Sequence, residues 1–364
     1  MKKLLQLKLL LPFLVLLFSA STSAENHMIK NPYGLTTETE LYDTFNPKIN
    51  AFWEKNAVSD YFFGVANKKI HTVSIITGNA NAIVISQGRN ESVLKYKELA
   101  YDLNRQGYDL YLIDHRGQGF SERLGGDQHR GHVEHFQDYV ADFNHYILSL
   151  KLADKYQHNY LLSHSMGATI STLYLEQYKH PFQASILFSP MLSINMGRIP
   201  VTVAKLITYS GTTLCNWFSD KACYIFGGND FKPKQFNDNQ LTDSKVRFNS
   251  SQNSYLAFPE TQLGDASMRW VATSVSAAQQ AINSADKINI PILVLQAGAD
   301  SIVTADGQYR FFENLTHCKM KRFYNIENAK HEIYLEKDQY RLTALNATLK
   351  FLQELQQGKH PCVA

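Results

Sequence analysis

The chain has 364 residues, of which 44% are hydrophobic and 19% are charged, a composition typical of a globular protein with a large core. The 36 basic residues outnumber the 33 acidic ones, but Lys2, Lys3 and Lys8 lie in the first 24 residues, which contain no acidic residue. The rest of the chain is therefore balanced in charge. This balance argues against a nucleic-acid partner and against electrostatic binding to an anionic membrane.

Residues 1–24 have the features of a secretory signal. Lys2 and Lys3 form a positive start, residues 9–18 form an apolar run, and residues 22–24 form a small-residue cleavage site. The apolar run is short for a transmembrane helix, so an uncleaved anchor in the inner membrane is the alternative. We expect a periplasmic or secreted protein that begins at Glu25.

From residue 61 onward, the sequence predicts strands and helices in alternation. After a hairpin at residues 61–76, apolar runs predict strands at residues 82–86, 108–113, 160–162, 184–188, 291–296 and 319–325. Helical spacing or composition predicts helices at residues 93–105, 136–151, 166–178, 304–314 and 339–356. This order indicates an α/β fold with a mostly parallel central sheet and helices on both faces.

The alternation stops between residues 191 and 286, where no buried strand is evident. We interpret this stretch as a cap inserted over the carboxyl edge of the sheet. The core would then consist of residues 25–190 and 287–364.

An apolar helix is predicted within the cap at residues 199–209. Its stripe of Ile199, Val203 and Leu206 fits either helix packing or the wall of an acyl-chain groove. The cap is also where we expect any peripheral contact with a membrane.

A strand, a small-residue turn and a helix meet at residues 159–170, with Ser165 at the apex of the turn. Such an elbow holds a serine hydroxyl beside a helix N-terminus, where free N–H groups favour negative charge. Gly167 meets the need for a small residue, and Ser163 replaces the usual first glycine of G-x-S-x-G. The motif is short enough to occur by chance, so the assignment depends on partners elsewhere.

Two later loops supply those partners. Asp300 follows the strand at 291–296, and His331 follows the strand at 319–325. The order Ser165, Asp300, His331 is that of α/β-hydrolases. Asp306 and Glu332 are alternative acids, but Asp306 fits a helix start and Glu332 is too close in sequence to reach the ring of His331.

The oxyanion of the reaction requires two N–H donors. The N–H of Met166, first in the helix, supplies one. The second is expected from the loop at residues 87–92, where Gly88 permits close approach of the backbone. We assign this donor to Arg89, with Asn90 as the alternative.

Four cysteines are present, and export would permit disulfides. We predict the pairs Cys215–Cys223, a short local loop, and Cys318–Cys362, which would hold the C-terminal tail. The alternative is that these are free buried thiols.

Two further groups of residues are expected to have a structural role and no part in the chemistry. One group lies on the loop after residue 113 and is expected to shape the active-site wall: Asp114, Arg116, Gly117 and Gly119. The other group has the spacing of metal ligands, but Gly131 interrupts the helix and we expect no metal there: His129, His132 and His135.

The chain resembles a known family in several motifs along its length. The matching segments are residues 88–92 (Gly-Arg-Asn-Glu-Ser), 114–119 with Ser121, 131–133, 138–140, 164–167, 331–333 and 336–338. In these it looks like bacterial lysophospholipase L2, which is related to the monoacylglycerol lipases. The resemblance implies an α/β-hydrolase fold without metal or cofactor, hydrolysing the remaining acyl ester of a lysophospholipid.

The same resemblance implies roles for particular residues. Ser165 would be the nucleophile, Asp300 the acid and His331 the base, with backbone donors at Arg89 and Met166. The export signal departs from the family, which is often described as associated with the inner membrane.

Other functions remain open on the sequence alone. A monoacylglycerol lipase, a broad carboxylesterase or an acyltransferase would use the same residues. A non-catalytic lipid-binding protein would not need all three members of the triad, and a dehalogenase would need a carboxylate in place of Ser165.

Overall fold

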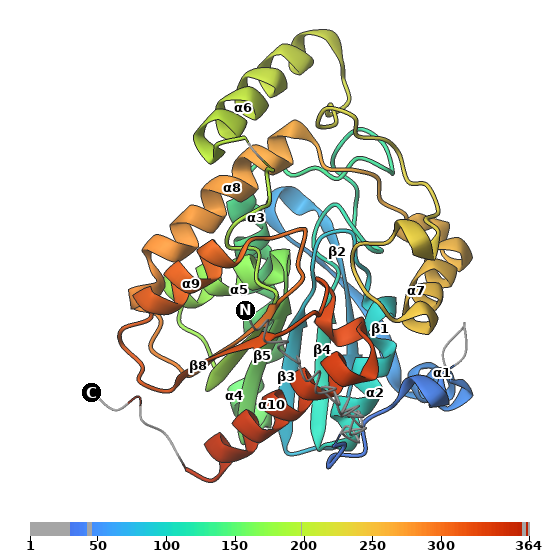
Figure 1. Ribbon diagram of the computed structural model, residues 1–364, viewed down its shortest axis with the longest axis vertical. Helices are drawn as coiled ribbons and strands as arrows, with labels where there is room; N and C mark the ends of the chain where they lie inside the picture. Colours follow the sequence, from blue (N-terminus) through green and yellow to red (C-terminus); the bar gives the residue numbers. More distant parts are fainter. Residues whose placement is uncertain (1–29, 42–45, 198, 359–361, 363–364) are drawn as a thin grey trace, which may run out of the picture.

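The computed structural model describes residues 30–41, 46–197, 199–358 and 362. The predicted signal at residues 1–24 lies outside this part of the chain. Within it, eight strands form one sheet with the order β1-β2-β4-β3-β5-β6-β7-β8 (Figure 1). The strands are β1 Ala57–Phe63, β2 Lys69–Ile75, β3 Asn81–Ser86, β4 Tyr108–Ile113, β5 His158–His164, β6 Ala184–Phe188, β7 Ile292–Ala297 and β8 Lys321–Ile326.

The sheet is antiparallel at one edge and parallel elsewhere. β1 and β2 form the predicted hairpin, and β2 also pairs antiparallel with β4. All pairs from β4 to β8 are parallel. The predicted α/β-hydrolase class is confirmed, and the carboxyl ends of β3, β5, β7 and β8 lie at a common edge.

Helices cover both faces of the sheet. The cluster containing Val84 includes residues of α3, α5, α8 and α9, while the cluster containing Ile83 and Ile85 includes residues of α2 and α10. Alternate residues of β3 thus face opposite layers, as the period of a strand requires. The helices are α1 Pro47–Asn56, α2 Lys97–Arg105, α3 Phe136–Leu150, α4 Leu152–Lys155, α5 Met166–Gln177, α6 Val201–Phe218, α7 Lys245–Ala257, α8 Met268–Asn283, α9 Ala305–Asn314 and α10 Asp338–Gln356.

The segment predicted as a cap contains α6, α7 and α8, which occupy different places (Figure 1). Helix α8 packs against α3, α5 and α9, so it belongs to the helical layer on one face of the sheet. Helix α6 lies on the outer side of α8, and α7 lies across the molecule beside the turn that precedes α2. The part of the segment that stands furthest from the sheet is therefore α6.

Small residues let α6 lie close to α8. Ala204, Thr208 and Cys215 are its buried positions, and a Cβ placed on Gly211 would be only 2.4 Å from Sδ of Met268 in α8. This spacing places a narrow stripe of small side chains on one face of the helix. The predicted stripe is on another face: Ile199, Val203 and Leu206 are 50%, 44% and 67% exposed. Helix packing does not explain those three residues.

Both predicted cysteine pairs are present as disulfides. Cys215–Cys223 has a Cα–Cα distance of 6.0 Å, and Cys318–Cys362 one of 4.6 Å. The first ties the last turn of α6 to the loop that follows it. None of the helices in the described ranges is long and apolar enough to span a bilayer.

Candidate active site

Ser165 lies in a strained turn between β5 and α5. Its φ of +49° and ψ of −116° are rarely adopted by a residue with a side chain. Two backbone contacts hold this conformation, because Ser165 N donates to Phe188 O and Met191 N donates to Ser165 O, both at 3.0 Å. The strain directs the hydroxyl away from the sheet edge, as in a nucleophile elbow.

The small residues of the elbow are required by close packing. A Cβ on Gly167 would lie 2.2 Å from the carbonyl oxygen of Ser86 in β3, so a larger residue would displace that strand. Ser163 is fully buried, and its hydroxyl donates to Ser171 Oγ at 2.7 Å. The serine in place of the first glycine is thus accommodated by a hydrogen bond of its own.

The structure brings Ser165, His331 and Asp300 together. His331 Nε2 lies 2.9 Å from Ser165 Oγ, and His331 Nδ1 lies 2.7 Å from Asp300 Oδ2. Asp300 Oδ1 accepts hydrogen bonds from the backbone N–H groups of Ile302 and Val303 at 2.8 and 3.1 Å. The geometry is that of a nucleophile, a base and an orienting acid in a row.

Electrostatics keep the acid of this row ionised. Burial alone would raise the pKa of the Asp300 carboxyl, but hydrogen bonding and charge attraction from His331, with the two backbone donors, bring it below its usual range. An ionised Asp300 favours the tautomer of His331 that carries a proton on Nδ1. Nε2 is then free to accept a proton from Ser165.

The two alternative acids are engaged elsewhere. The Asp306 carboxylate lies 3.4 Å from Nη1 of Arg310, both near the surface. Glu332 is buried and forms an ion pair with Lys95 at 2.5 Å.

The two candidate donors in the loop between β3 and the turn before α2 differ in their hydrogen bonds. Gly88 N donates to Glu91 Oε2 at 2.6 Å, and Asn90 N donates to Gln118 Oε1 at 3.2 Å. Among the described residues, no acceptor is found for Arg89 N. This favours Arg89 over Asn90 as a donor to a bound oxyanion.

A second donor lies in the elbow itself. Met166 begins α5, and the first N–H groups of a helix have no partner within the helix. The segments that carry Met166 and Arg89 are in close contact. A Cβ on Gly167, the residue after Met166, would lie 2.5 Å from the carbonyl oxygen of Gln87, two residues before Arg89.

Glu91 holds three parts of the candidate site together, a role that its sequence does not indicate. Its carboxylate accepts hydrogen bonds from Gly88 N, from the hydroxyl of Tyr96 at 2.6 Å and from that of Tyr334 at 2.9 Å. Oε1 also lies 3.0 Å from Nδ1 of His164, the residue before the candidate nucleophile.

Glu91 and its neighbours shift one another's pKa values within a buried cluster. Burial lowers the pKa of His164, but the Glu91 carboxylate outweighs this effect and the pKa of His164 is raised. Burial raises the pKa of Glu91, but His164 and Lys95 bring it well below its usual range. Lys95 in turn pairs with Glu332. The cluster therefore joins the elbow, the loop at residues 87–92 and the segment after His331.

Asp114, predicted as part of the active-site wall, holds the loop at residues 87–92 through hydrogen bonds. Its carboxylate accepts hydrogen bonds from Gln87 Nε2 at 2.5 Å, from Val93 N at 2.9 Å and from Phe120 N at 3.0 Å. Oδ2 also lies 2.7 Å from Nδ1 of the buried His71. The carboxylate therefore fixes both ends of the loop that carries Arg89.

The other residues of that motif hold neighbouring loops. Arg116 forms a buried ion pair with Asp142 of α3 at 2.6 Å and contacts Asp138 at 3.0 Å. Gly119 has a φ of +54°, and a Cβ there would lie 2.2 Å from Cγ of Asp114.

The three histidines at 129, 132 and 135 are not grouped as ligands. Over the described ranges, no three side chains of His, Cys, Asp or Glu are arranged to hold a metal ion. His132 Nδ1 instead lies 2.9 Å from Ser267 Oγ, at the start of α8.

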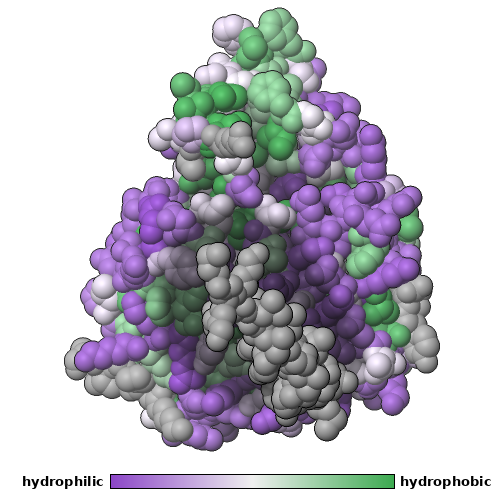
Figure 2. Space-filling model, in the orientation of Figure 1, coloured by the Kyte–Doolittle hydropathy of each residue, from purple (hydrophilic) through white to green (hydrophobic). Residues whose placement is uncertain are grey.

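The apolar residues of α6 are open to solvent. Figure 2 shows hydrophobic atoms gathered at the end of the molecule where α6 lies. Besides the predicted stripe, the exposed set includes Leu214, Trp217, Phe218 and Phe226, with Trp217 and Phe218 at 75% and 81% exposure. Exposed apolar side chains gathered in this way are typical of surfaces that bind a protein or a membrane.

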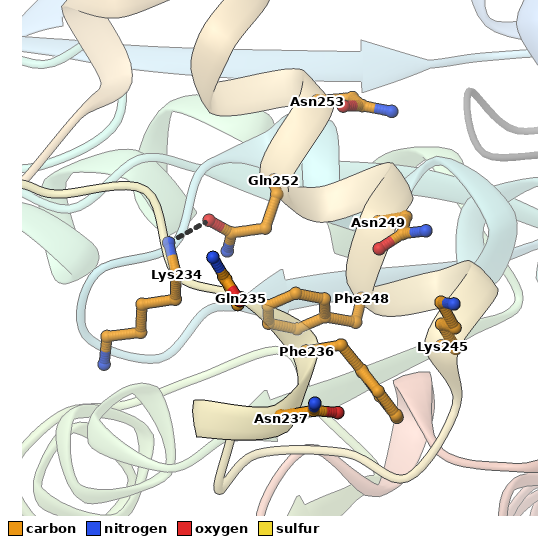
Figure 3. A pocket seen from close by; sticks show the side chains of 9 residues that line it. All are labelled: Lys234, Gln235, Phe236, Asn237, Lys245, Phe248, Asn249, Gln252 and Asn253. Atoms are coloured by element: carbon orange, nitrogen blue, oxygen red, sulfur yellow. Dashed lines mark hydrogen bonds between the residues drawn. The ribbon is translucent and has the colours of Figure 1, made fainter.

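A surface cavity of about 350 Å³ lies beside α7 (Figure 3). Lys234, Lys245, Phe236 and Phe248 line it together with five amide side chains, and Lys234 N donates to Gln252 Oε1 at 3.3 Å. Lysine, amide and phenylalanine side chains do not make a nucleophile and base pair, so the reaction is not placed there.

Known proteins resemble the chain over most of its length. The family described as "Serine aminopeptidase, S33" matches residues 78–338. The chain is 34% identical over 303 residues to the probable lysophospholipase L2 of Haemophilus influenzae, covering 81% of this chain and 91% of that protein. It is 33% identical over 311 residues to lysophospholipase L2 of Escherichia coli K12, covering 82% and 88%.

A solved structure supports the fold. A soluble variant of monoglyceride lipase from Saccharomyces cerevisiae superposes with a TM-score of 0.64 at 18% identity, covering 82% of this chain and 96% of that one. The resemblance stated from the motifs is therefore confirmed: the chain belongs to the lysophospholipase L2 family and is an ester hydrolase with the α/β-hydrolase fold.

Proposed function

We propose that the protein is a lysophospholipase that cleaves the acyl ester of single-chain phospholipids with the triad Ser165, His331 and Asp300. The observation that carries the proposal is the continuous row of hydrogen-bond distances from Ser165 Oγ through His331 to Asp300, at 2.9 and 2.7 Å. The substrate class is supported by the names of the two relatives.

The reaction proceeds through an acyl-enzyme. Ser165 Oγ attacks the ester carbonyl while His331 Nε2 takes its proton, and Asp300 stabilises the imidazolium that forms. The N–H groups of Arg89 and Met166 hold the oxyanion. His331 then protonates the departing glycerophosphodiester, and the same ring activates a water molecule that releases the fatty acid.

Substrate profiling tests the proposal. The protein from Glu25 onward should hydrolyse lysophosphatidylcholine faster than a monoacylglycerol or a short nitrophenyl ester. Faster turnover of the other two would favour the monoacylglycerol lipase or the broad carboxylesterase, and transfer of the acyl group to an added alcohol in preference to water would favour the acyltransferase.

Ser165→Ala is the control for the catalytic assignment. Losing the nucleophile should lower kcat on the order of 10⁶-fold, and the thermal unfolding temperature should stay close to that of the wild type. Normal activity in this variant would refute the triad. Covalent labelling of Ser165 by a fluorophosphonate would exclude a lipid-binding protein without catalysis.

The exposed residues of α6 are proposed as a peripheral membrane contact on a periplasmic or secreted enzyme. Trp217 and Phe218 are aromatic and exposed, which suits the interface of a lipid bilayer. Replacing both by serine should reduce sedimentation with neutral phosphatidylcholine vesicles. Turnover of a soluble nitrophenyl ester should stay at the wild-type rate, and vesicle binding equal to that of the wild type would contradict the proposal.

A further inference from the structure

The guanidinium of Arg89 is a cation without a partner of opposite charge. Its Nη2 donates to the carbonyl oxygen of Gly264 at 2.9 Å, and its Cζ lies 5.0 Å from the ring of Trp270 in α8. Nε is enclosed and has no hydrogen-bond partner. Across the described ranges, no carboxylate oxygen comes within 4.0 Å of the group.

This arrangement is unusual for a buried arginine. Burial lowers the pKa of Arg89, and Tyr139, Asp265 and Tyr224 offset this effect only in part. By contrast, Arg116, Arg247 and Arg341 each form an ion pair with a carboxylate at 3.0 Å or less. A buried charge is normally paired, so Arg89 has capacity for an anionic ligand.

The loop that carries Arg89 packs against the elbow. The backbone N–H of Arg89 has no acceptor among the described residues, and its neighbour Gly88 lies so close to the elbow that a Cβ there would be 2.8 Å from His164 Nδ1. The residue as a whole keeps part of its surface open to solvent.

We propose that the Arg89 side chain binds the phosphate diester of the substrate's head group, while its main chain binds the oxyanion. The inference rests on the proposed function and deepens it. It assigns to one residue the preference for a lysophospholipid over an uncharged monoacylglycerol.

The distance from the ester carbonyl to the phosphate of the substrate is similar to the distance from the backbone N to the guanidinium of Arg89. In a 1-acyl lysophospholipid, about six covalent bonds separate the carbonyl carbon from the phosphorus, and about six separate the N and Cζ atoms of arginine, so each path spans roughly 5–8 Å. An ester carbonyl on Arg89 N therefore leaves the phosphate within reach of the guanidinium. Arginine binds phosphate oxygens through its planar fork of N–H groups.

The test compares two substrates with the same acyl chain, lysophosphatidylglycerol and monoacylglycerol, in mixed micelles of one neutral detergent. Arg89→Met keeps the backbone N–H but removes the cation. The ratio of kcat/KM for the phospholipid to kcat/KM for the monoacylglycerol should fall about 10- to 100-fold, the value of a hydrogen bond to a charged group. Arg89→Lys, which keeps a cation without the fork, should recover part of the ratio.

Arg130→Met is a matched control. Arg130 also joins the core to the inserted segment, donating to Ala222 O at 3.2 Å and lying 4.0 Å from the ring of Tyr224, but it pairs with Asp127. Its substitution should leave the substrate ratio at the wild-type value.

The outcomes separate this inference from the proposed function. If the wild type hydrolyses neither ester, the proposed function fails. If both esters are hydrolysed and Arg89→Met lowers the two rates equally or not at all, only the head-group assignment fails. Inhibition by inorganic phosphate that requires Arg89, with an unchanged substrate ratio, would indicate a free-phosphate site and would also overturn the assignment.

Discussion

Asp300 is held by more contacts than an orienting acid requires. The carboxylate accepts one hydrogen bond from His331 and two from the backbone, so its position does not depend on its charge alone. An asparagine at this position can keep the geometry, but its amide can donate to Nδ1 and so favour the wrong tautomer of His331.

Asp300→Asn should therefore lower kcat by about 10³- to 10⁴-fold while KM stays near the wild-type value. Steady-state kinetics on lysophosphatidylcholine would measure this change. Asp306→Asn is the matched control, because Asp306 is exposed and its partner within the described ranges is Arg310. The activity of this variant should be that of the wild type. The reverse pattern would identify Asp306 as the acid.

At the scale of elements, α7 is joined to the core by a buried arginine. Arg247 of α7 forms an ion pair with Glu98 of α2 at 2.9 Å and with Asp338 of α10 at 2.9 Å. Burial raises the pKa of Glu98, but Arg247 and Arg341 lower it below its usual range. Because the folded-state pKa is depressed, the Glu98 carboxylate stabilises the fold above its ordinary pKa of 4.5, and this contribution is lost as the pH falls through the depressed value.

Glu98→Gln should lower the free energy of unfolding by about 3–5 kcal/mol at pH 7. The difference from the wild type should shrink as the pH is taken below 4.5, because Glu98 of the unfolded chain then takes up a proton while the folded carboxylate is still ionised. Urea unfolding followed by circular dichroism at pH 7, 5 and 3.5 would measure it. Glu122→Gln removes an exposed pair with Lys68 and should cost less than about 1 kcal/mol at pH 7.

The elements of the core were largely predictable because their signals are local. The strand predicted at residues 184–188 coincides with β6, and the predicted helix at 304–314 differs from α9 by one residue. The helix predicted at 199–209 continues to Phe218 instead, because Gly211 packs against Met268 in place of ending the helix. That contact joins segments far apart in sequence, and periodicity does not reveal it.

The strand-end positions of the candidate site were predictable, and its contacts between loops were not. Ser165, Asp300 and His331 each follow a strand, and a parallel sheet brings such positions to one edge. The contacts of Glu91 and of the Arg89 side chain were not predictable, because they depend on which loops meet. The Tyr334 hydroxyl, for example, reaches Glu91 across 243 positions of sequence.

At the scale of the whole molecule, two disulfides differ in the length of chain they enclose. Cys215–Cys223 spans 8 positions and Cys318–Cys362 spans 44. Closing a longer loop removes more entropy from the unfolded chain, so the second bond should contribute more to stability, by roughly 1.5 kcal/mol.

Cys318→Ser with Cys362→Ser should therefore lower the free energy of unfolding more than Cys215→Ser with Cys223→Ser. Urea unfolding of both double variants would measure the difference. Mass spectrometry of the wild type, with and without reductant after denaturation, should first show a gain of four hydrogen atoms. A mass unaffected by reductant would mean that the cysteines are free thiols.

The positions of these bonds also govern the order in which they can close during synthesis. A chain that emerges N-terminus first exposes Cys215 and Cys223 before Cys318, so the short loop can be oxidised while no other thiol competes for it. Cys318 and Cys362 are then the two thiols that remain. They cannot form a disulfide until Cys362, which follows α10 in the chain, has been synthesised. Closure in this order gives one of the three conceivable pairings of four cysteines.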